Sequence, residues 1–502
     1  MLLTDERAHG VAESAHTASQ KQTAARSAAP QRGILVPLAL TQFVASFAGS
    51  NMNVAISNIT QDLNTTVHGV QTAITLFLLC MAALMIPGSK LTDIWGRKRC
   101  LIGGLVIYGT GAVIAALAPA LAVLIIGYSA FEGVGSALMI PPIYILATMA
   151  FGDVQSRARA VGAISGAGGI GAATGPLIGG LITTAISWRV SFLLQAAIVA
   201  AIIVLTLRLT DPVAPDPSRR FDIWGGVLCA VGMSFVVIGI LQAGNNNVLL
   251  VVFLLVGAGF SLWFFLHVRS MERAGAEPLL SMALFRSRVS NLGLVTQNIQ
   301  WLLMMGSSLT ITLFLQTVRH FSAIKTGVIF TASTAGLLVA SAAQQRLARN
   351  YRQRTLIIAG FIVAIAGVGL LLAFALANDT TSVWWFVPGL LLFGLGVGAM
   401  LTPSVNIVQS AFPEEKQGEI SGLSRSVSNL GSSMGTAIAG TILVADLGSG
   451  PRSSYQVAMI ALTLLALVGL AAAIALPGGA EEPAGAGRPS ARKTGATAMR
   501  AG

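Results

Sequence analysis

Fourteen apolar segments, each long enough to cross a lipid bilayer, follow one another along this 502-residue chain. A bilayer core about 30 Å thick requires roughly 20 apolar residues per helix. Only 10% of the residues are charged, whereas soluble proteins carry about 25%. The sequence therefore predicts an all-α integral membrane protein with 14 transmembrane helices. The predicted spans cover 33–58, 69–88, 100–119, 121–149, 158–184, 190–209, 222–243, 247–268, 289–318, 323–345, 355–377, 383–410, 417–445 and 454–476.

The Lys and Arg residues predict the orientation of these spans. With the N-terminus inside, 26 of them lie on the cytoplasmic side, four lie outside, and Arg425 lies within a span. Because cytoplasmic loops carry an excess of Lys and Arg, we expect a multi-pass protein of the cytoplasmic (inner) cell membrane with both termini in the cytoplasm. The same rule accounts for the net charge of +12. We therefore expect the lipid bilayer as a partner and no nucleic acid.

An internal repeat relates spans 4 and 5 to spans 12 and 13. The same residue types recur at the same spacing eight spans later. The matched pairs are Gly133 and Gly394, Gly135 and Gly396, Met139 and Met400, Pro142 and Pro403, Gly171 and Gly431, and Gly175 and Gly435. An even offset gives parallel repeats, which are related by an axis along the membrane normal. Spans 1–6 and 9–14 are thus predicted to form two pseudo-symmetric six-helix bundles, with spans 7 and 8 as an inserted helix pair.

This repeat divides the chain into five parts. We expect a disordered cytoplasmic N-terminal tail over 1–32, an N-terminal six-helix bundle over 33–209, the inserted pair with flanking cytoplasmic loops over 210–288, a C-terminal six-helix bundle over 289–477 and a disordered cytoplasmic C-terminal tail over 478–502. Two bundles that face each other enclose a site near the membrane midplane. Rocking of the bundles around such a site would give alternating access.

Two motifs occupy fixed places among the spans. The loop after span 2 carries GSKLTDIWGRKR at 88–99, and span 5 carries GAATGPLIGG at 171–180. Glu272, PLL at 278–280 and LFR at 284–286 precede span 9. The loop resembles a signature of the major facilitator superfamily, and span 5 resembles that superfamily's antiporter motif. With fourteen spans, the chain resembles the fourteen-span drug:proton antiporters of this superfamily.

The resemblance implies a secondary active transporter of the multidrug efflux type. Such a protein exports small amphipathic compounds, including drugs, antibiotics and toxic metabolites, in exchange for protons, and confers antibiotic resistance. The expected partner is a small-molecule substrate, and the proton is the coupling ion with no other cofactor. A dedicated exporter of one metabolite, a carrier that is not proton-coupled and a non-transporting membrane sensor are the alternatives.

The loop motif predicts a conformational latch. Its residues are Asp93, Gly96, Arg97 and Lys98. The resemblance implies that Asp93 lies near the start of a helix in the other bundle, where the helix dipole favours a carboxylate. That contact would hold one conformation and release in the other. A surface ion pair of little energetic value is the alternative.

The motif in span 5 predicts a helix with one face that lacks side chains. The antiporter-motif helix comprises Gly171, Gly175, Pro176, Gly179 and Gly180. Three of its glycines recur every four residues, so they line one face on which another helix can pack closely. The proline permits a bend. We expect span 10, which carries small residues over 331–336, to pack on this face, at an interface between the bundles that must close and reopen. Plain structural packing is the alternative.

The sequence departs from the family at the positions most tied to proton coupling. Ala48 replaces an Asp of span 1, and Ser129 and Glu132 replace an Arg and a Gln of span 4. The other acidic residues lie in tails, loops or the ends of spans, which leaves Glu132 as the one acidic residue near mid-membrane. An ionisable group inside a membrane is a functional-site hypothesis, because burying its charge is energetically costly. We predict that Glu132 is the proton-coupling residue. A permanently neutral carboxyl bonded to Tyr128, Ser129 or Ser136 is the alternative.

Other polar side chains deep in the spans are candidates for substrate binding. We expect Arg425 to pair with Glu132 or with an anionic substrate group, because an unpaired buried charge is costly; snorkelling toward the cytoplasm is the alternative. The Asn and Gln side chains in the spans could instead form hydrogen bonds between helices, which is the alternative to substrate binding. The predicted substrate-binding set is Asn51, Asn53, Glu132, Gln297, Asn298, Trp301, Arg425 and Asn429.

No catalytic or metal-binding group is expected. The sequence shows no nucleophile and base in a recognisable arrangement and no His deep in a span. Its three cysteines, Cys80, Cys100 and Cys229, lack the spacing of a metal site or of a disulfide framework. We therefore predict a transporter rather than an enzyme, and a monomer, with a homo-oligomer as the alternative.

Overall fold

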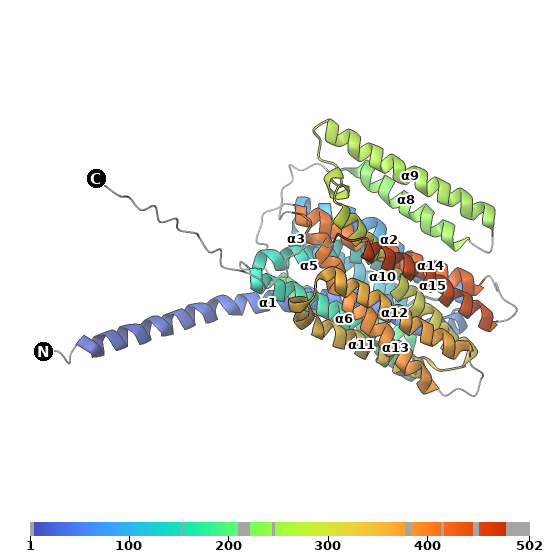
Figure 1. The fold of residues 1–502 in the computed structure, drawn as a ribbon, viewed down its shortest axis with the longest axis horizontal. Helices are drawn as coiled ribbons and strands as arrows, with labels where there is room; N and C mark the ends of the chain where they lie inside the picture. The colour runs from blue at the N-terminus through green and yellow to red at the C-terminus, as the bar shows by residue number, and fades with distance from the viewer. Residues whose placement is uncertain are drawn as a thin grey trace, which may run out of the picture.

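The protein, described by a computed structural model, is a bundle of long helices (Figure 1). The helix axes are roughly aligned, and the chain runs back and forth along them. The structure describes residues 5–151, 154–208, 221–242, 246–376, 383–412, 416–444 and 451–477, with the backbone alone for 5–32. The helices of the first half are α1 (Asp5–Asp62), α2 (Val67–Trp95), α3 (Arg97–Ala116), α4 (Leu121–Leu124) continued by the π-helical turn η1 (Ile125–Glu132) and α5 (Gly133–Ala150), α6 (Val154–Ala185) and α7 (Trp188–Leu207).

The second half repeats this arrangement after an inserted pair of helices. The pair is α8 (Ile223–Leu241) and α9 (Asn247–Arg273). The later elements are η2 (Met282–Phe285), α10 (Arg288–Leu313) continued by η3 (Phe314–Val318), α11 (Ala323–Asn350), α12 (Gln353–Leu376), η4 (Val383–Trp385), α13 (Phe386–Gln409), α14 (Gln417–Val444) and α15 (Pro451–Ile474). All fourteen predicted spans are therefore helical where the structure describes them.

Thirteen helices of the described residues are long and apolar enough to cross a membrane. The one predicted span that falls short, 417–445, corresponds to α14, which carries many serines together with Glu419 and Arg425. This helix packs between α10 and α2, so protein rather than lipid surrounds much of it. Polar residues are tolerated there because neighbouring helices supply hydrogen-bond partners.

The N-terminal segment differs from its prediction. The sequence favoured a disordered tail over 1–32, whereas α1 begins at Asp5 and projects from the bundle toward the N-terminus (Figure 1). The segment is rich in Ala, which has the highest helix propensity, so the helix of span 1 extends outward through it. The predicted C-terminal tail, 478–502, lies outside the described residues.

Glycines bring helix backbones into contact within each bundle. In the N-terminal bundle Gly104 of α3 meets Gly135 of α5, and in the C-terminal bundle Gly360 of α12 meets Gly396 of α13. A Cβ on Gly104 would lie 2.8 Å from the Gly135 oxygen, and one on Gly360 would lie 2.8 Å from the Gly396 oxygen. Equivalent helix pairs thus use equivalent glycines, as the sequence repeat predicts.

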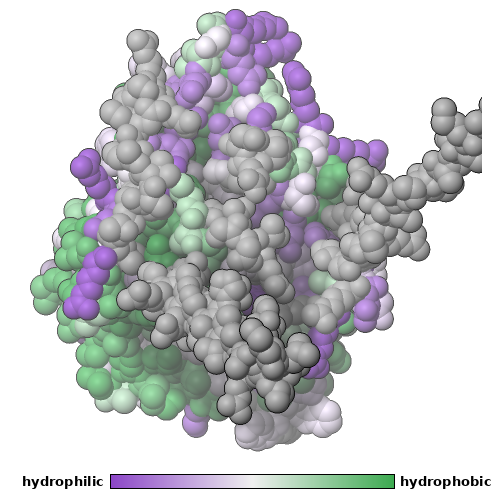
Figure 2. All heavy atoms as spheres, turned by 90° about the vertical axis from the view of Figure 1, so that its left-hand side faces the viewer, coloured by the Kyte–Doolittle hydropathy of each residue, from purple (hydrophilic) through white to green (hydrophobic). Residues whose placement is uncertain are grey.

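The two bundles meet along two seams, α2 with α14 and α6 with α11. The inserted pair covers one of them, because α8 packs on α2 and α14 while α9 packs on the outer side of α8 (Figure 1). Leu79 of α2, Val237 and Leu241 of α8, and Ala437 of α14 form one buried cluster at this place. Figure 2 views the end from which α1 projects and shows hydrophilic side chains there beside an apolar flank.

Neighbouring glycines of α3 provide a test of this packing. Gly104→Leu would force side-chain atoms into the α5 backbone, because a Cβ at this position already lies 2.7 Å from the Met139 nitrogen. Overpacking typically costs about 1–3 kcal/mol. We expect a lower melting temperature in detergent for Gly104→Leu. The matched control is Gly103→Leu, whose Cβ would meet nothing within 4 Å; equal melting temperatures for the two variants would contradict the packing.

Candidate functional site

A small cavity lies between the two bundles. Its volume is about 40 Å³, which holds a few water molecules and no drug-sized compound. In this conformation the cavity is therefore too small for such a compound. The described residues that line the cavity are Ser50, Ala172, Pro176, Met304, Met305, Ser308, Phe330, Ser333, Thr334, Leu337, Phe393, Gly394 and Val397.

Glu132 is fully buried, with 0% of its surface exposed. It ends the π-helical turn η1, a distortion that is frequent at functional sites. Neither of its carboxyl oxygens has a hydrogen-bond partner among the described residues. An ionised carboxyl without a partner is very costly in such surroundings, so this conformation suits the uncharged acid.

Two of the three hydroxyls that the sequence offered as partners of Glu132 are engaged elsewhere. Tyr128 donates to the carbonyl oxygen of Ala48 at 3.4 Å, and Ser129 donates to that of Ala73 at 2.7 Å. The Ser136 hydroxyl has no partner within the described residues. A Glu132 carboxyl hydrogen-bonded to Tyr128, Ser129 or Ser136 is thus not seen among the described residues in this conformation.

A chain of buried polar groups begins beside Glu132. Tyr108 of α3 interacts electrostatically with the Glu132 carboxyl, and its hydroxyl donates to Gln195 Oε1 of α7 at 2.5 Å. Gln195 Nε2 donates to the Ser191 carbonyl oxygen at 3.3 Å. The Ser191 hydroxyl then makes a long contact of 3.5 Å with Asn51 Oδ1 of α1. Two residues that the sequence singled out, Glu132 and Asn51, are thereby connected inside the N-terminal bundle.

The connecting residues were missed by sequence reasoning. Tyr108, Ser191 and Gln195 lie on α3 and α7, which hold no charged residue near the membrane centre. Gln195 alone carried a signal, because it is a single amide in an otherwise apolar stretch of α7. Its role depends on the packing of α3 beside α7, which the sequence does not show.

Arg425 lies apart from Glu132. Its guanidinium stands over the Tyr144 ring, 4.4 Å from the ring centroid, and so joins α14 of one bundle to α5 of the other by a cation–π contact. Ser89 and Gly418 lie beside it. The expected ion pair with Glu132 does not form in this structure, because Arg425 is only two turns into α14 whereas Glu132 lies inside the N-terminal bundle.

The deep amides mostly join helices. Gln297 Oε1 accepts from the Ser424 hydroxyl at 2.9 Å, and Asn298 Nδ2 donates to the Val427 carbonyl oxygen at 2.9 Å. Both bonds connect α10 with α14. Buried Asn53 has a carbonyl oxygen without a partner within the described residues, and Trp301 and Asn429 are half-buried. In this conformation, none of the predicted substrate-binding residues belongs to the described lining of the cavity.

The α2–α14 seam is closed by hydroxyl groups that donate to backbone carbonyls. Ser426 donates to the Ala82 oxygen at 2.5 Å, and Ser433 donates to the Thr75 oxygen at 3.0 Å. Near the other end of the seam, Gln71 Nε2 donates to a backbone oxygen of α14 at 3.3 Å. The serines that make α14 the least apolar span therefore hold the two bundles together.

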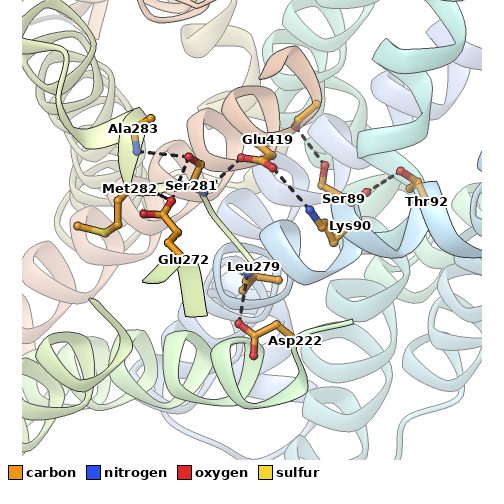
Figure 3. Close-up of polar contacts among 11 residues, drawn as sticks. Ser89, Lys90, Thr92, Asp222, Glu272, Leu279, Ser281, Met282, Ala283 and Glu419 are labelled. Carbon is orange, nitrogen blue, oxygen red and sulfur yellow. Dashed lines mark hydrogen bonds and ion pairs between the residues drawn. The ribbon is translucent and has the colours of Figure 1, made fainter. Parts of the chain in front are cut away.

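A second set of contacts ties α2 to the start of α14. The Ser89 hydroxyl donates to the Gly418 carbonyl oxygen at 3.2 Å, and Lys90 Nζ lies 3.5 Å from Glu419 Oε1 (Figure 3). The other oxygen of Glu419 accepts from the Ser281 amide at 3.2 Å. We call these five residues the end contact. Through Glu419 it joins both bundles and the linker between α9 and α10.

Two further carboxylates hold this linker. Glu272 Oε1 accepts from the Ser281 hydroxyl at 3.2 Å and from the Met282 amide at 2.7 Å. Asp222 accepts from the Leu279 amide at 3.2 Å (Figure 3). It also contacts the His267 ring at 2.9 Å. The motif residues before α10 thus have a structural explanation, since their amides are anchored to the inserted pair.

Comparison with known proteins now identifies the family. The model of the Major Facilitator Superfamily matches residues 38–299 and 293–500. The chain belongs to the major facilitator superfamily.

Relatives within this superfamily carry names of drug resistance and export. "Multidrug resistance protein Stp" of Mycobacterium tuberculosis is 28% identical over 421 residues, which cover 83% of this chain and 76% of that protein. The "Probable actinorhodin transporter" of Streptomyces coelicolor is 30% identical over 417 residues, covering 81% and 72%. The "Tetracenomycin C resistance and export protein" of Streptomyces glaucescens is 27% identical over 422 residues, covering 82% and 76%.

Solved structures support the same fold. The crystal structure of the peptide transporter POT in complex with sulfate aligns with a TM-score of 0.64 and 17% identity. The alignment covers 88% of this chain and 94% of that one. The predicted fold class, an all-α membrane protein of the major facilitator type, is thereby confirmed.

The superfamily loop motif is only partly explained by the predicted latch. Asp93 pairs with Arg97 at 3.2 Å within the N-terminal bundle, and Lys98 Nζ donates to the Leu207 carbonyl oxygen at 2.9 Å. Gly96 has a φ of 94°, which L side chains rarely adopt, and so permits the sharp turn between α2 and α3. The neighbouring residues Ser89 and Lys90 make contacts with α14 of the other bundle.

The prediction that the glycine face of the antiporter-motif helix packs against span 10 is wrong. Gly171, Gly175 and Gly179 face α1, where a Cβ at each would collide with Phe43, Ser50 or Asn51 respectively. The spacing of the glycines defines a smooth face but does not determine which helix covers it.

Contact with α11 is made by the other side of α6. A Cβ on Gly180 would lie 2.5 Å from the Ala323 carbonyl oxygen, and Gly327 packs on the Pro176 backbone. The Thr184 hydroxyl accepts from the Ile324 amide at 3.1 Å. Two motif residues, Pro176 and Gly180, thus form the inter-bundle seam, while three form the α1–α6 contact within one bundle.

The end contact predicts which residues hold the bundles together. A partly exposed ion pair stabilises by up to about 1 kcal/mol, so Glu419→Gln should increase the open population by up to about fivefold. Spin labels at the exposed positions Trp95 and Tyr351, one in each bundle, would report this as a longer distance in double electron–electron resonance. Arg97→Gln is the control and should leave the distance distribution unchanged; the reverse pattern would assign closure to the predicted latch.

Proposed function

We propose that this protein is a secondary active exporter that moves small amphipathic compounds, including drugs or antibiotics, out of the cell in exchange for protons. The named relatives support drug export. The superfamily architecture supports a carrier, because two bundles around one midplane cavity can expose it to either side in turn. One chain supplies both bundles, so a monomer suffices for this cycle, and both termini face the cytoplasm.

Alternating access requires the two ends of the interface between the bundles to open separately. The end contact lies at one end of the α2–α14 seam. Gln316 of η3 lies toward the opposite end, where it accepts from the Ser57 hydroxyl at 2.7 Å and donates to the Val54 carbonyl oxygen at 2.8 Å. Release of the first set opens the cavity to the cytoplasm, and release of the second opens it to the outside.

The observation that carries the proton coupling is the full burial of Glu132 without a cationic partner among the described residues. Glu132 is fully buried and its carboxyl oxygens have no hydrogen-bond partner among the described residues. Such a group is stable only as the uncharged acid here, and becomes stable as the carboxylate when water or a donor reaches it. A conformational change that hydrates Glu132 therefore releases a proton, and the reverse change takes one up.

The buried polar chain connects the protonation state of Glu132 to the contacts between the bundles. An ionised Glu132 attracts the Tyr108 hydroxyl, which in this conformation donates to Gln195. Loss of that donor changes the contacts of Gln195 and, through Ser191, those of Asn51. Asn51 fills the space beside Gly179 of α6, and α6 also forms the seam with α11.

Replacement of the carboxyl tests this assignment. Glu132→Gln is nearly isosteric and stays uncharged, so the variant should bind ligand with little change and release no proton. Proton release on ligand addition is measured in weakly buffered detergent, and export and counterflow are measured in proteoliposomes. We expect gradient-driven export to fall at least about tenfold, a change of about 1.4 kcal/mol, while counterflow persists.

Glu277→Gln is the matched control for this experiment, because it makes the same chemical change at an exposed position before α10 and should leave proton release intact. Unchanged proton release in Glu132→Gln would remove Glu132 from the mechanism. Ala48 and Ser129, which replace charged residues of the family, favour a second candidate, a carrier that is not proton-coupled. That carrier would keep exporting after the proton gradient is collapsed.

Removal of one hydroxyl tests the polar chain. Tyr108→Phe should reduce gradient-driven export by about tenfold while counterflow changes less than about twofold, because the variant removes the group that joins Glu132 to Gln195. Tyr455→Phe, a buried tyrosine of the C-terminal bundle, is the control and should affect neither rate. Equal loss of export and counterflow in Tyr108→Phe would instead indicate a purely structural role.

A further inference from the structure

The cavity between the bundles has no charged side chain in its described lining. Its walls combine two thioethers, Met304 and Met305, with two aromatic rings, Phe330 and Phe393. Hydroxyl groups add hydrogen-bonding capacity, among them Ser308 of α10. The lining therefore offers polarisable apolar surface and neutral polar groups, but no counter-ion.

The nearest ionisable groups are held away from this space. Glu132, the one carboxyl near the midplane, is enclosed in the N-terminal bundle beside Tyr108 of α3 and is absent from the cavity lining. Arg425 lies over Tyr144 at a separate place between α5 and α14. Because all other acidic residues of the described spans lie at helix ends, opening of the bundles brings no further carboxylate to the midplane.

This distribution of charge restricts what can bind. An organic cation would lose its hydration in the cavity without gaining a negative partner, which is costly in a low-dielectric site. Two phenylalanine rings offer only a partial replacement through cation–π contacts. An uncharged aromatic compound loses little hydration, packs against the flexible methionines, and can exchange hydrogen bonds with the serine and threonine hydroxyls.

We infer that the cavity, once separation of the bundles enlarges it, binds uncharged aromatic compounds with carbonyl or hydroxyl groups and discriminates against organic cations. This inference rests on the proposed export function and names its substrate class. The proton site and the substrate site are then separate, so the two do not compete for the same atoms. Exchange of an uncharged compound for protons carries net positive charge into the cell, and the membrane potential drives export together with the pH gradient.

A matched pair of fluorescent ligands tests the discrimination. 10-Methylacridone and 10-methylacridinium share a three-ring skeleton, but the first is uncharged with a carbonyl group and the second is a permanent cation. Binding to the purified full-length protein in lipid nanodiscs is followed by fluorescence anisotropy. We expect the acridone to bind at least tenfold more tightly. Equal or tighter binding of the cation, or binding of neither compound, overturns the inference.

A new carboxylate tests the physical cause. Ser308→Asp places a negative charge in the cavity and should strengthen binding of the acridinium at least tenfold, whereas Ser308→Asn, of the same size and uncharged, should not. If the Ser308→Asp protein folds and binds acridinium no more tightly than the wild type, the assignment of this cavity as the binding site is contradicted. If this variant does not fold, the comparison of acridone and acridinium on the wild-type protein still decides which class of compound binds.

Export assays separate the inference from the proposed function. Acridone that binds but is not exported from proteoliposomes by a proton gradient leaves the inference standing and contradicts proton-driven export. Gradient-driven export of the acridinium at the rate of the acridone keeps the proposed function and overturns the inference.

Discussion

Close approach of helix backbones at small residues is the constraint on which the rest of this structure depends. Lipid supplies no hydrophobic force between transmembrane helices, so association relies on van der Waals packing and interhelical hydrogen bonds. Gly104 and Gly135 bring α3 against α5 within a bundle, and Gly180 and Gly327 bring α6 against α11 between bundles. Serine hydroxyls that donate to carbonyl oxygens complete the α2–α14 seam. A seam built mainly from such neutral contacts can separate and re-form without exposing many charges to lipid.

The cost of an isolated charge determines where ionisable groups lie. Lys90 and Glu419 pair at one end of the α2–α14 seam, and Arg425 is stabilised by the Tyr144 ring. Glu132 has no such partner, which suits a group that must change its protonation state. Its enclosure in one bundle, away from the cavity, means that coupling has to pass through helices, and the path from Tyr108 to Asn51 provides the connecting contacts.

Much of the fold was predictable because it depends on local sequence. Apolar length gave the fourteen helices, and the recurrence of Gly133 and Gly135 as Gly394 and Gly396 indicated two equivalent bundles with an inserted pair. Over the first residues the structure has a helix where a disordered tail was predicted, because an Ala-rich segment without an apolar run can still extend an adjoining helix. For the site, elimination among the acidic residues selected Glu132, but Tyr108 and Gln195 escaped notice since each is ordinary in its own helix.

The sequence by itself determined the number of membrane spans, the internal repeat and the one acidic residue near the membrane centre, because span length, residue spacing and charge are properties of the chain alone. Tertiary structure decided which helices meet. It placed the glycine face of α6 on α1 rather than on α11, kept Arg425 apart from Glu132, and surrounded the inter-bundle cavity with uncharged residues. The physical reason is that a helix pattern defines the character of a face, whereas the partner of that face depends on the packing of the whole bundle.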